Sequence, residues 1–171
     1  MPRQLVLDTS YLDELFRVPG YFDEAAAQEI IDRCAAAIEQ GDRLYVPVPV
    51  IYELGNHVAT IHDGGRRIAL ATKLTDTIAQ SLANTSPWII TPFSDAQTVI
   101  GYQKALSNAV TSFRDAFAAS QIGLTDISVL DEARRLSTGP HGRSLGFVTH
   151  IWTRDAQLKA YEPDTERNAF V

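Results

Sequence analysis

Four carboxylates stand where a folded chain would bring them together. Asp8 and Asp155 each follow a short apolar run, Asp126 opens a segment of helical pattern, and Glu53 borders the apolar stripe of another. Carboxylates that converge repel one another unless a cation lies among them. Because ligand sets made only of oxygen select hard cations, the four acids predict a Mg²⁺ or Mn²⁺ site suited to phosphoryl-transfer chemistry.

The elements that must position these acids alternate between strands and helices. Strands are predicted over residues 4–7, 44–47, 88–92 and 146–153. Helices are predicted over residues 10–17, 23–40, 49–62, 66–84, 94–121 with an irregularity at Gly101, 125–136, and shortly after residue 155. Strands joined by helices form a mostly parallel sheet, so the fold class is α/β. Ligands of such sheets bind beyond the carboxyl ends of the strands, where Asp8 and Asp155 are expected.

Composition restricts the classes of function. The chain has 171 residues, with 15 Lys and Arg against 21 Asp and Glu, a net charge of −6. This length predicts one domain, which we place at residues 1–162, followed by a polar C-terminal tail at 163–171. The acidic balance excludes a protein that binds nucleic acid mainly by coating phosphates with basic side chains. It leaves open a nuclease whose acids hold metal ions.

The compartment is predicted from cysteine usage and apolar runs. Cys34 is the single cysteine, and the first residues lack the apolar core of a secretion signal, so we expect a cytoplasmic protein. The longest uncharged stretch, residues 77–94, contains two prolines and several polar side chains, and a membrane-spanning segment is therefore not expected.

Four stretches carry a family resemblance. The chain resembles PIN-domain ribonucleases, with the VapC-type toxins as the nearest subgroup, in the successive motifs LDTS at 7–10, VPVIYELGN at 48–56, GLTD at 123–126 and WTRDAQL at 152–158. The resemblance implies a single PIN-like domain with three α/β/α layers and a metal-dependent endoribonuclease activity. It also implies an RNA substrate, a cognate antitoxin as protein partner, and a homodimer.

Carried over by position, the resemblance assigns roles to single residues. Asp8, Glu53, Asp126 and Asp155 match the family's metal-binding catalytic acids, and Thr153 matches the hydroxyl residue of the last motif. Asn56, one helical turn after Glu53, is expected either to hydrogen-bond the substrate or a water at the metal, or to be an ordinary exposed residue.

Substrate binding requires local positive charge. The candidates are Arg66, Arg67, Lys73, Arg134, Arg135, Arg143 and Arg154. Arg154 is the strongest of them because it adjoins Asp155. We expect Arg154→Ala to weaken RNA binding and its salt dependence while leaving metal affinity unchanged.

Other interpretations compete with a nuclease. Each Asp taken alone is explained as a helix cap, and Glu53 as a partner of a cation such as Arg43; the joint order of the acids favours the metal site. A PIN-like module that acts only by protein contact, or a metal-dependent DNA nuclease, remains an alternative. Zinc is not expected because His57 and His62 lack the spacing of a helical ligand pair.

Overall fold

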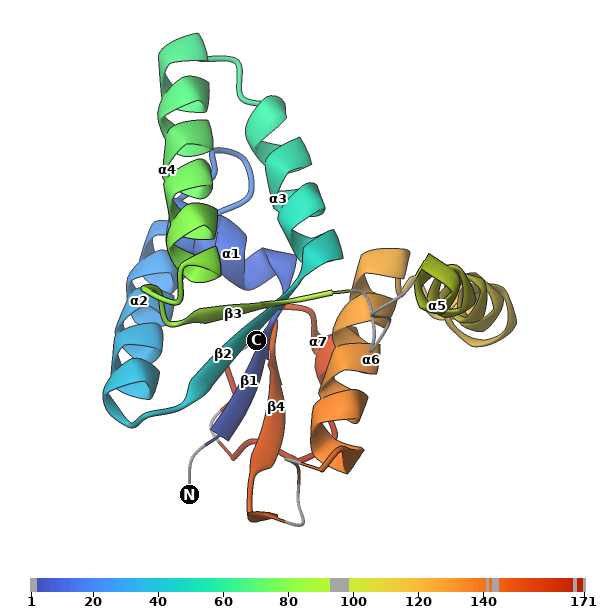
Figure 1. Ribbon diagram of the computed structural model, residues 1–171. Helices are drawn as coiled ribbons and strands as arrows, with labels where there is room; N and C mark the ends of the chain where they lie inside the picture. Colours follow the sequence, from blue (N-terminus) through green and yellow to red (C-terminus); the bar gives the residue numbers. More distant parts are fainter. Residues whose placement is uncertain (1–2, 93–98, 141, 143–144, 168, 171) are drawn as a thin grey trace.

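A computed structural model of the chain describes residues 3–92, 99–140, 142, 145–167 and 169–170. Four parallel strands form one sheet in the order β3-β2-β1-β4 (Figure 1). Their bounds are β1 (Arg3–Leu7), β2 (Arg43–Pro47), β3 (Trp88–Thr91) and β4 (Val148–Trp152). The predicted α/β class is confirmed, and the carboxyl ends of all four strands lie at one edge of the sheet.

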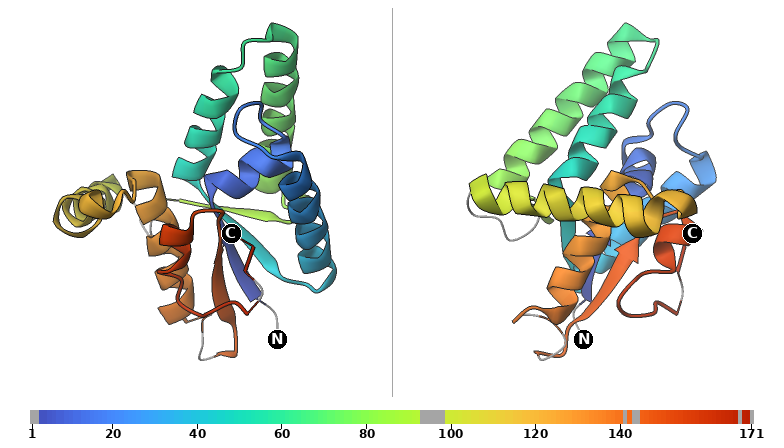
Figure 2. Two further views of the ribbon diagram at one scale, coloured as in Figure 1. Left: turned by 180° about the vertical axis from the view of Figure 1, so that it is seen from behind. Right: turned by 90° about the vertical axis from the view of Figure 1, so that its right-hand side faces the viewer.

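Helices cover both faces of this sheet, which gives three layers (Figure 2). Helix α6 (Leu124–Thr138) packs on one face, and α1 (Thr9–Phe16) and α2 (Glu24–Glu39) pack on the other. Helices α3 (Val48–Ala59) and α4 (Gly64–Leu82) form a hairpin that extends beyond the carboxyl ends of the strands (Figure 1). The short α7 (Ala156–Lys159) follows β4.

The core lies between the layers. Because the sheet is covered on both faces, its strands consist mostly of apolar residues. Leu5, Val6 and Leu7 of β1 are completely buried, as expected for a parallel strand covered on both faces. From α2, Ile30 and Cys34 pack into the same cluster, so Cys34 is a core residue as its position on the apolar face predicts.

The long helix predicted over residues 94–121 is interrupted at a different place from the one expected. Its predicted start at Ser94 lies outside the described residues, and α5 (Val99–Ser112) runs through Gly101 without a break. The helix instead changes to a π-turn at η1 (Phe113–Phe117) and then to a 3₁₀-turn at η2 (Ala118–Ser120). Phe117 is buried and Phe113 packs against the core, which accounts for the altered winding at this point.

The outer edge of β4 is closed by side chains. The backbone N–H of Thr149 donates to Asp164 (2.8 Å), and that of Ile151 donates to Glu162 (3.2 Å). These carboxylates occupy donors that an edge strand otherwise exposes for pairing with another chain. Asp164, which belongs to the predicted polar tail at 163–171, therefore contacts the edge strand of the domain.

Across the described helices, none combines the length and apolar character that crossing a membrane requires.

Candidate functional site

The four predicted acids lie at or near the beginnings of four different helices. Asp8 caps α1 directly after β1, and its backbone N–H donates to Trp152 at the end of β4 (3.0 Å). Asp155 caps α7 three residues after Trp152, where its carboxylate accepts from the backbone of the first helical turn. Glu53 lies in the second turn of α3, and Asp126 lies in the first turn of α6.

The charges of the other three acids act on Asp126. The pKa of Asp126 is raised to about 6, chiefly by burial; a hydrogen bond from Gly123 opposes the rise, and the charges of Asp8, Glu53 and Asp155 add to it. Burial also raises the pKa of Asp8. Each carboxylate that ionises here makes ionisation of the others less favourable, and a cation would remove that penalty.

Two hydroxyl groups orient Asp8. Ser10 Oγ (2.7 Å) and Thr153 Oγ1 (2.8 Å) both donate to Asp8 Oδ2, and the Thr153 hydroxyl in turn accepts from the backbone N–H of Asp155 (2.9 Å). Thr153 is almost completely buried, which fixes this geometry. The sequence pattern does not single out Ser10 as a site residue, although Ser10 Oγ also accepts from the backbone N–H of Arg154 (2.9 Å).

Glu53 is held by a neighbour on α1. Thr9 Oγ1 donates to Glu53 Oε2 at 2.6 Å. The alternative partner, Arg43, lies at the opposite end of β2, with its guanidinium over the Phe147 ring. One turn further along both helices, His57 Nδ1 contacts the buried Asp13 carboxylate at 2.9 Å. Helices α1 and α3 are thus joined by two successive polar contacts beside the acids.

Arg154 forms an ion pair within the protein. Its Nη1 bonds to Oε1 of Glu14, which is completely buried, and Oε2 of the same carboxylate accepts from the backbone N–H of Asp23 (2.9 Å). About a third of the Arg154 side chain, 36%, is exposed. The residue therefore links the end of β4 to α1.

Asn56, the other residue expected near the acids, is exposed on α3.

The other basic candidates are spread over the surface. Arg134 and Arg135 pair with acids on their own helix, and Arg143 lies outside the described residues. Arg67 and Lys73 donate to backbone carbonyls of Ile61 and Leu15.

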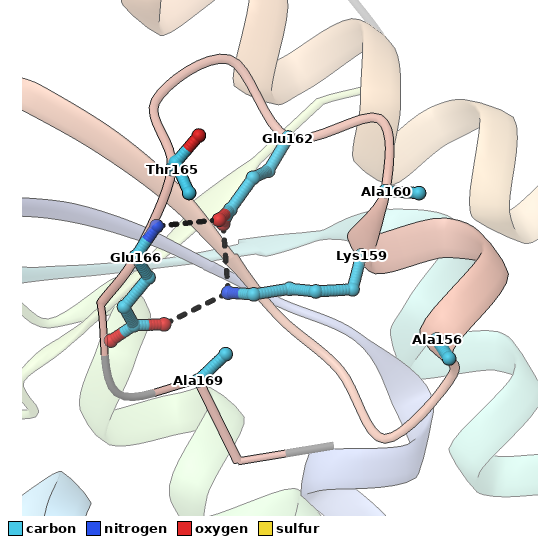
Figure 3. A pocket seen from close by; sticks show the side chains of 7 residues that line it. All are labelled: Ala156, Lys159, Ala160, Glu162, Thr165, Glu166 and Ala169. Carbon is cyan, nitrogen blue, oxygen red and sulfur yellow. Dashed lines mark hydrogen bonds and ion pairs between the residues drawn. The ribbon is translucent and has the colours of Figure 1, made fainter.

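A second group of ligand-type side chains lies near the C-terminal end of the chain. Among the described residues, the one set of three whose ligand atoms fall within 4.8 Å of one another is His150, Glu162 and Glu166. Figure 3 shows that the ammonium of Lys159 lies between the two glutamates, at 2.7 Å from Glu162 and 2.8 Å from Glu166. Arg33 also pairs with Glu166 (3.2 Å). Protein cations already neutralise this group, so it is a structural ion-pair network beside a cavity of about 350 Å³.

The acid site fits a divalent cation by its donor chemistry. Its four carboxylates supply only oxygen ligands. A bound cation would offset both the burial that chiefly raises the pKa of Asp126 and the smaller repulsion from the other three acids. The ligand atoms of these acids lie further apart than those of the Lys159 network. Binding of a cation would therefore draw the carboxylates together.

The sheet order and the layers define the class of fold. Four parallel strands flanked by helices match a PIN-like fold. A solved structure, that of FitAcB from Neisseria gonorrhoeae, is similar to this chain with a TM-score of 0.57 and 17% sequence identity, over 92% of this chain and 91% of that one. A likeness at this identity establishes a shared fold. No family model matches the chain, and no curated protein matches it either.

Proposed function

We propose that the protein is a metal-dependent endoribonuclease that hydrolyses RNA phosphodiester bonds, with Asp8, Glu53, Asp126 and Asp155 holding Mg²⁺ or Mn²⁺. The observation that supports the proposal is the placement of these acids: Asp8 and Asp155 cap the helices that follow β1 and β4, and Glu53 and Asp126 lie in the first two turns of α3 and α6. The order of the four motifs along the chain, which resembles that of PIN-domain ribonucleases, supports the choice of reaction.

The chain's own residues prepare the site. Ser10 and Thr153 fix the Asp8 carboxylate by donating to one of its oxygens, and Thr9 fixes Glu53. Hydrogen-bonded neighbours increase the affinity of a metal site by orienting the carboxylates that bind the ion. A bound divalent cation supplies Lewis acidity, activating water and neutralising charge that develops on the phosphate.

The biological setting in this proposal is that of a toxin. The nearest motif resemblance is to VapC-type toxins, and on that basis we propose a cognate antitoxin as protein partner, a homodimer, and action on RNA in the cytoplasm. These partners follow from the resemblance, and a purified complex of the chain with an antitoxin would test them.

The activity is tested by incubating the purified protein with mixed RNA and DNA in EDTA, Mg²⁺ or Mn²⁺. We expect cleavage of RNA with metal and none in EDTA, and loss of cleavage in Asp8→Asn. The matched control is Asp63→Asn, which alters the helix-capping aspartate of α4 at the α3–α4 turn, the end of the hairpin that lies away from the sheet (Figure 1). Asparagine caps helices as well as aspartate, so a loss confined to Asp8→Asn reflects charge at the site. Cleavage of DNA alone would favour the DNA nuclease, and absence of both metal binding and cleavage would favour the module that acts by protein contact.

A further inference from the structure

An aromatic stack lies next to the acid site. The Tyr21 and His57 rings are nearly parallel, with an interplanar angle of 9° and centroids 3.8 Å apart. The imidazole is the inner ring, held at Nδ1 by Asp13, which is buried. Tyr21 is 42% exposed. The pair is thus an aromatic surface that is anchored on its protein side and accessible on the other.

A tight turn sets the tyrosine in place. The backbone N–H of Tyr21 donates to the carbonyl of Val18 (3.0 Å), which closes a turn through Pro19 and Gly20. Gly20 has a φ of +89°, a conformation that side chains with a Cβ rarely adopt. The position of the Tyr21 ring is therefore built into the fold.

The stack is also fixed relative to the acids. His57 lies four residues after Glu53 on α3, a separation of about 6 Å along the helix axis. Asp13, which holds His57, lies within electrostatic range of both Asp8 and Glu53. The stack and Glu53 therefore lie on the same face of α3, one helical turn apart.

Two arginines lie near the turn that carries Tyr21, although the whole chain is acidic. Arg17 ends α1 four residues before Tyr21, and Arg66 from α4 donates to the Arg17 carbonyl (3.3 Å). Lys73 from the same helix donates to the Leu15 carbonyl (3.0 Å). Arg17 and Arg66 are thus cations near the turn that carries Tyr21, in the neighbourhood of two acids: Asp23, the N-cap of α2, and Glu24, which pairs with Arg17.

We propose that Tyr21, stacked on His57, forms a platform for one unpaired base of single-stranded RNA adjacent to the bond that is cleaved. This inference rests on the proposed nuclease function and names a specificity element of the same site. Exposed aromatic faces bind bases of single strands by stacking, and nearby cations bind the flanking phosphates. Bases inside a duplex are already stacked, so the platform selects unpaired RNA.

Binding without cleavage tests the platform directly. A fluorescently labelled single-stranded RNA oligonucleotide is titrated with the protein in EDTA, and affinity is read from anisotropy. We expect Tyr21→Ala to weaken binding about tenfold, the size of effect typical of losing one base–aromatic stack. Tyr21→Phe and Tyr21→Trp should stay within about twofold of the wild type, because both retain an aromatic ring. Replacing one base by an abasic site should remove the difference between wild type and Tyr21→Ala.

The matched control is Tyr161→Ala. Tyr161 is 41% exposed, almost the same as Tyr21, but it packs edge-on against Phe117 at an interplanar angle of 79°. We expect no change in RNA affinity. Equal affinities of wild type and Tyr21→Ala, or equal losses in Tyr21→Ala and Tyr161→Ala, would overturn the platform, as would absence of RNA binding by the wild type.

A second substrate separates failure of the platform from failure of the nuclease. Bis(p-nitrophenyl) phosphate is a phosphodiester without a nucleobase, so its hydrolysis with Mn²⁺ reports the acid site alone. Tyr21→Ala should hydrolyse it at the wild-type rate while its KM for RNA rises about tenfold. Hydrolysis by neither protein would contradict the nuclease, whereas an unchanged KM for RNA would contradict only the platform. Unchanged thermal unfolding of Tyr21→Ala confirms that the variant is folded.

Discussion

Replacement of Arg154 distinguishes two roles for this residue. From the sequence we expect it to bind RNA, but its guanidinium pairs with Glu14, which is completely buried. Arg154→Ala would leave that carboxylate in the protein interior without its cation. Breaking a buried ion pair costs about 3–5 kcal/mol. Because 36% of the Arg154 side chain is exposed and water can partly replace it, we expect a loss of about 2–3 kcal/mol.

The loss is measured by urea unfolding at neutral pH, with thermal unfolding as a second readout. For a protein of this size, such a loss lowers the melting temperature by about 5–10 °C. Glu14→Gln is the partner variant, because it removes the negative charge and keeps the shape. We expect the double variant to be more stable than the sum of the two single losses predicts, since Arg154 and Glu14 then no longer leave an unpaired charge.

One outcome would refute this structural role. If Arg154→Ala unfolds like the wild type within about 0.5 kcal/mol, and instead binds RNA more weakly with a reduced salt slope, the residue is a phosphate contact. The pairing with Glu14 would then be dispensable.

Three further predictions follow from individual contacts. Thr153→Val removes the 2.8 Å hydrogen bond to Asp8, so calorimetry should show Mn²⁺ affinity falling about 10- to 100-fold, whereas Thr153→Ser should retain it. Burial acts to raise the pKa of Glu162, but the neighbouring His150 and Lys159 lower it from 4.5 to about 2. After allowance for solvent screening, the resulting stabilisation is about 2 kcal/mol; it is present above pH 5 and lost towards pH 2, and unfolding of Glu162→Gln should lack this pH dependence. Burial raises the pKa of Cys34 to about 12, so iodoacetamide at pH 8 should modify it only in urea.

Much of the fold could be predicted because short-range signals agree with it. The apolar run before Asp8 is a strand because a parallel strand covered on both faces must be apolar throughout, and it ends where Asp8 caps the next helix. The same logic places Asp155 after β4. The parallel pairing of β1 with β4 then brings both acids to one edge, which alternation of strands and helices is sufficient to anticipate.

Contacts between distant residues could not be predicted in this way. The pairing of Arg154 with Glu14 spans 140 positions, and many cations could satisfy a buried carboxylate. Ser10 is of a residue type common at helix caps, so the sequence pattern does not indicate its hydrogen bond to Asp8. Tyr21 and His57 come from separate elements, and their stacking depends on how the turn at Gly20 places the ring against α3.

The central claim is that Asp8, Glu53, Asp126 and Asp155 form the divalent cation site. Calorimetric titration with Mn²⁺ of the wild type, Asp8→Asn and Glu162→Gln tests it most directly, because Glu162 belongs to the other group of close ligand-type side chains. We predict that the wild type and Glu162→Gln bind Mn²⁺ with the same affinity and that Asp8→Asn binds at least about tenfold more weakly. Binding that survives in Asp8→Asn and is lost in Glu162→Gln would contradict the account.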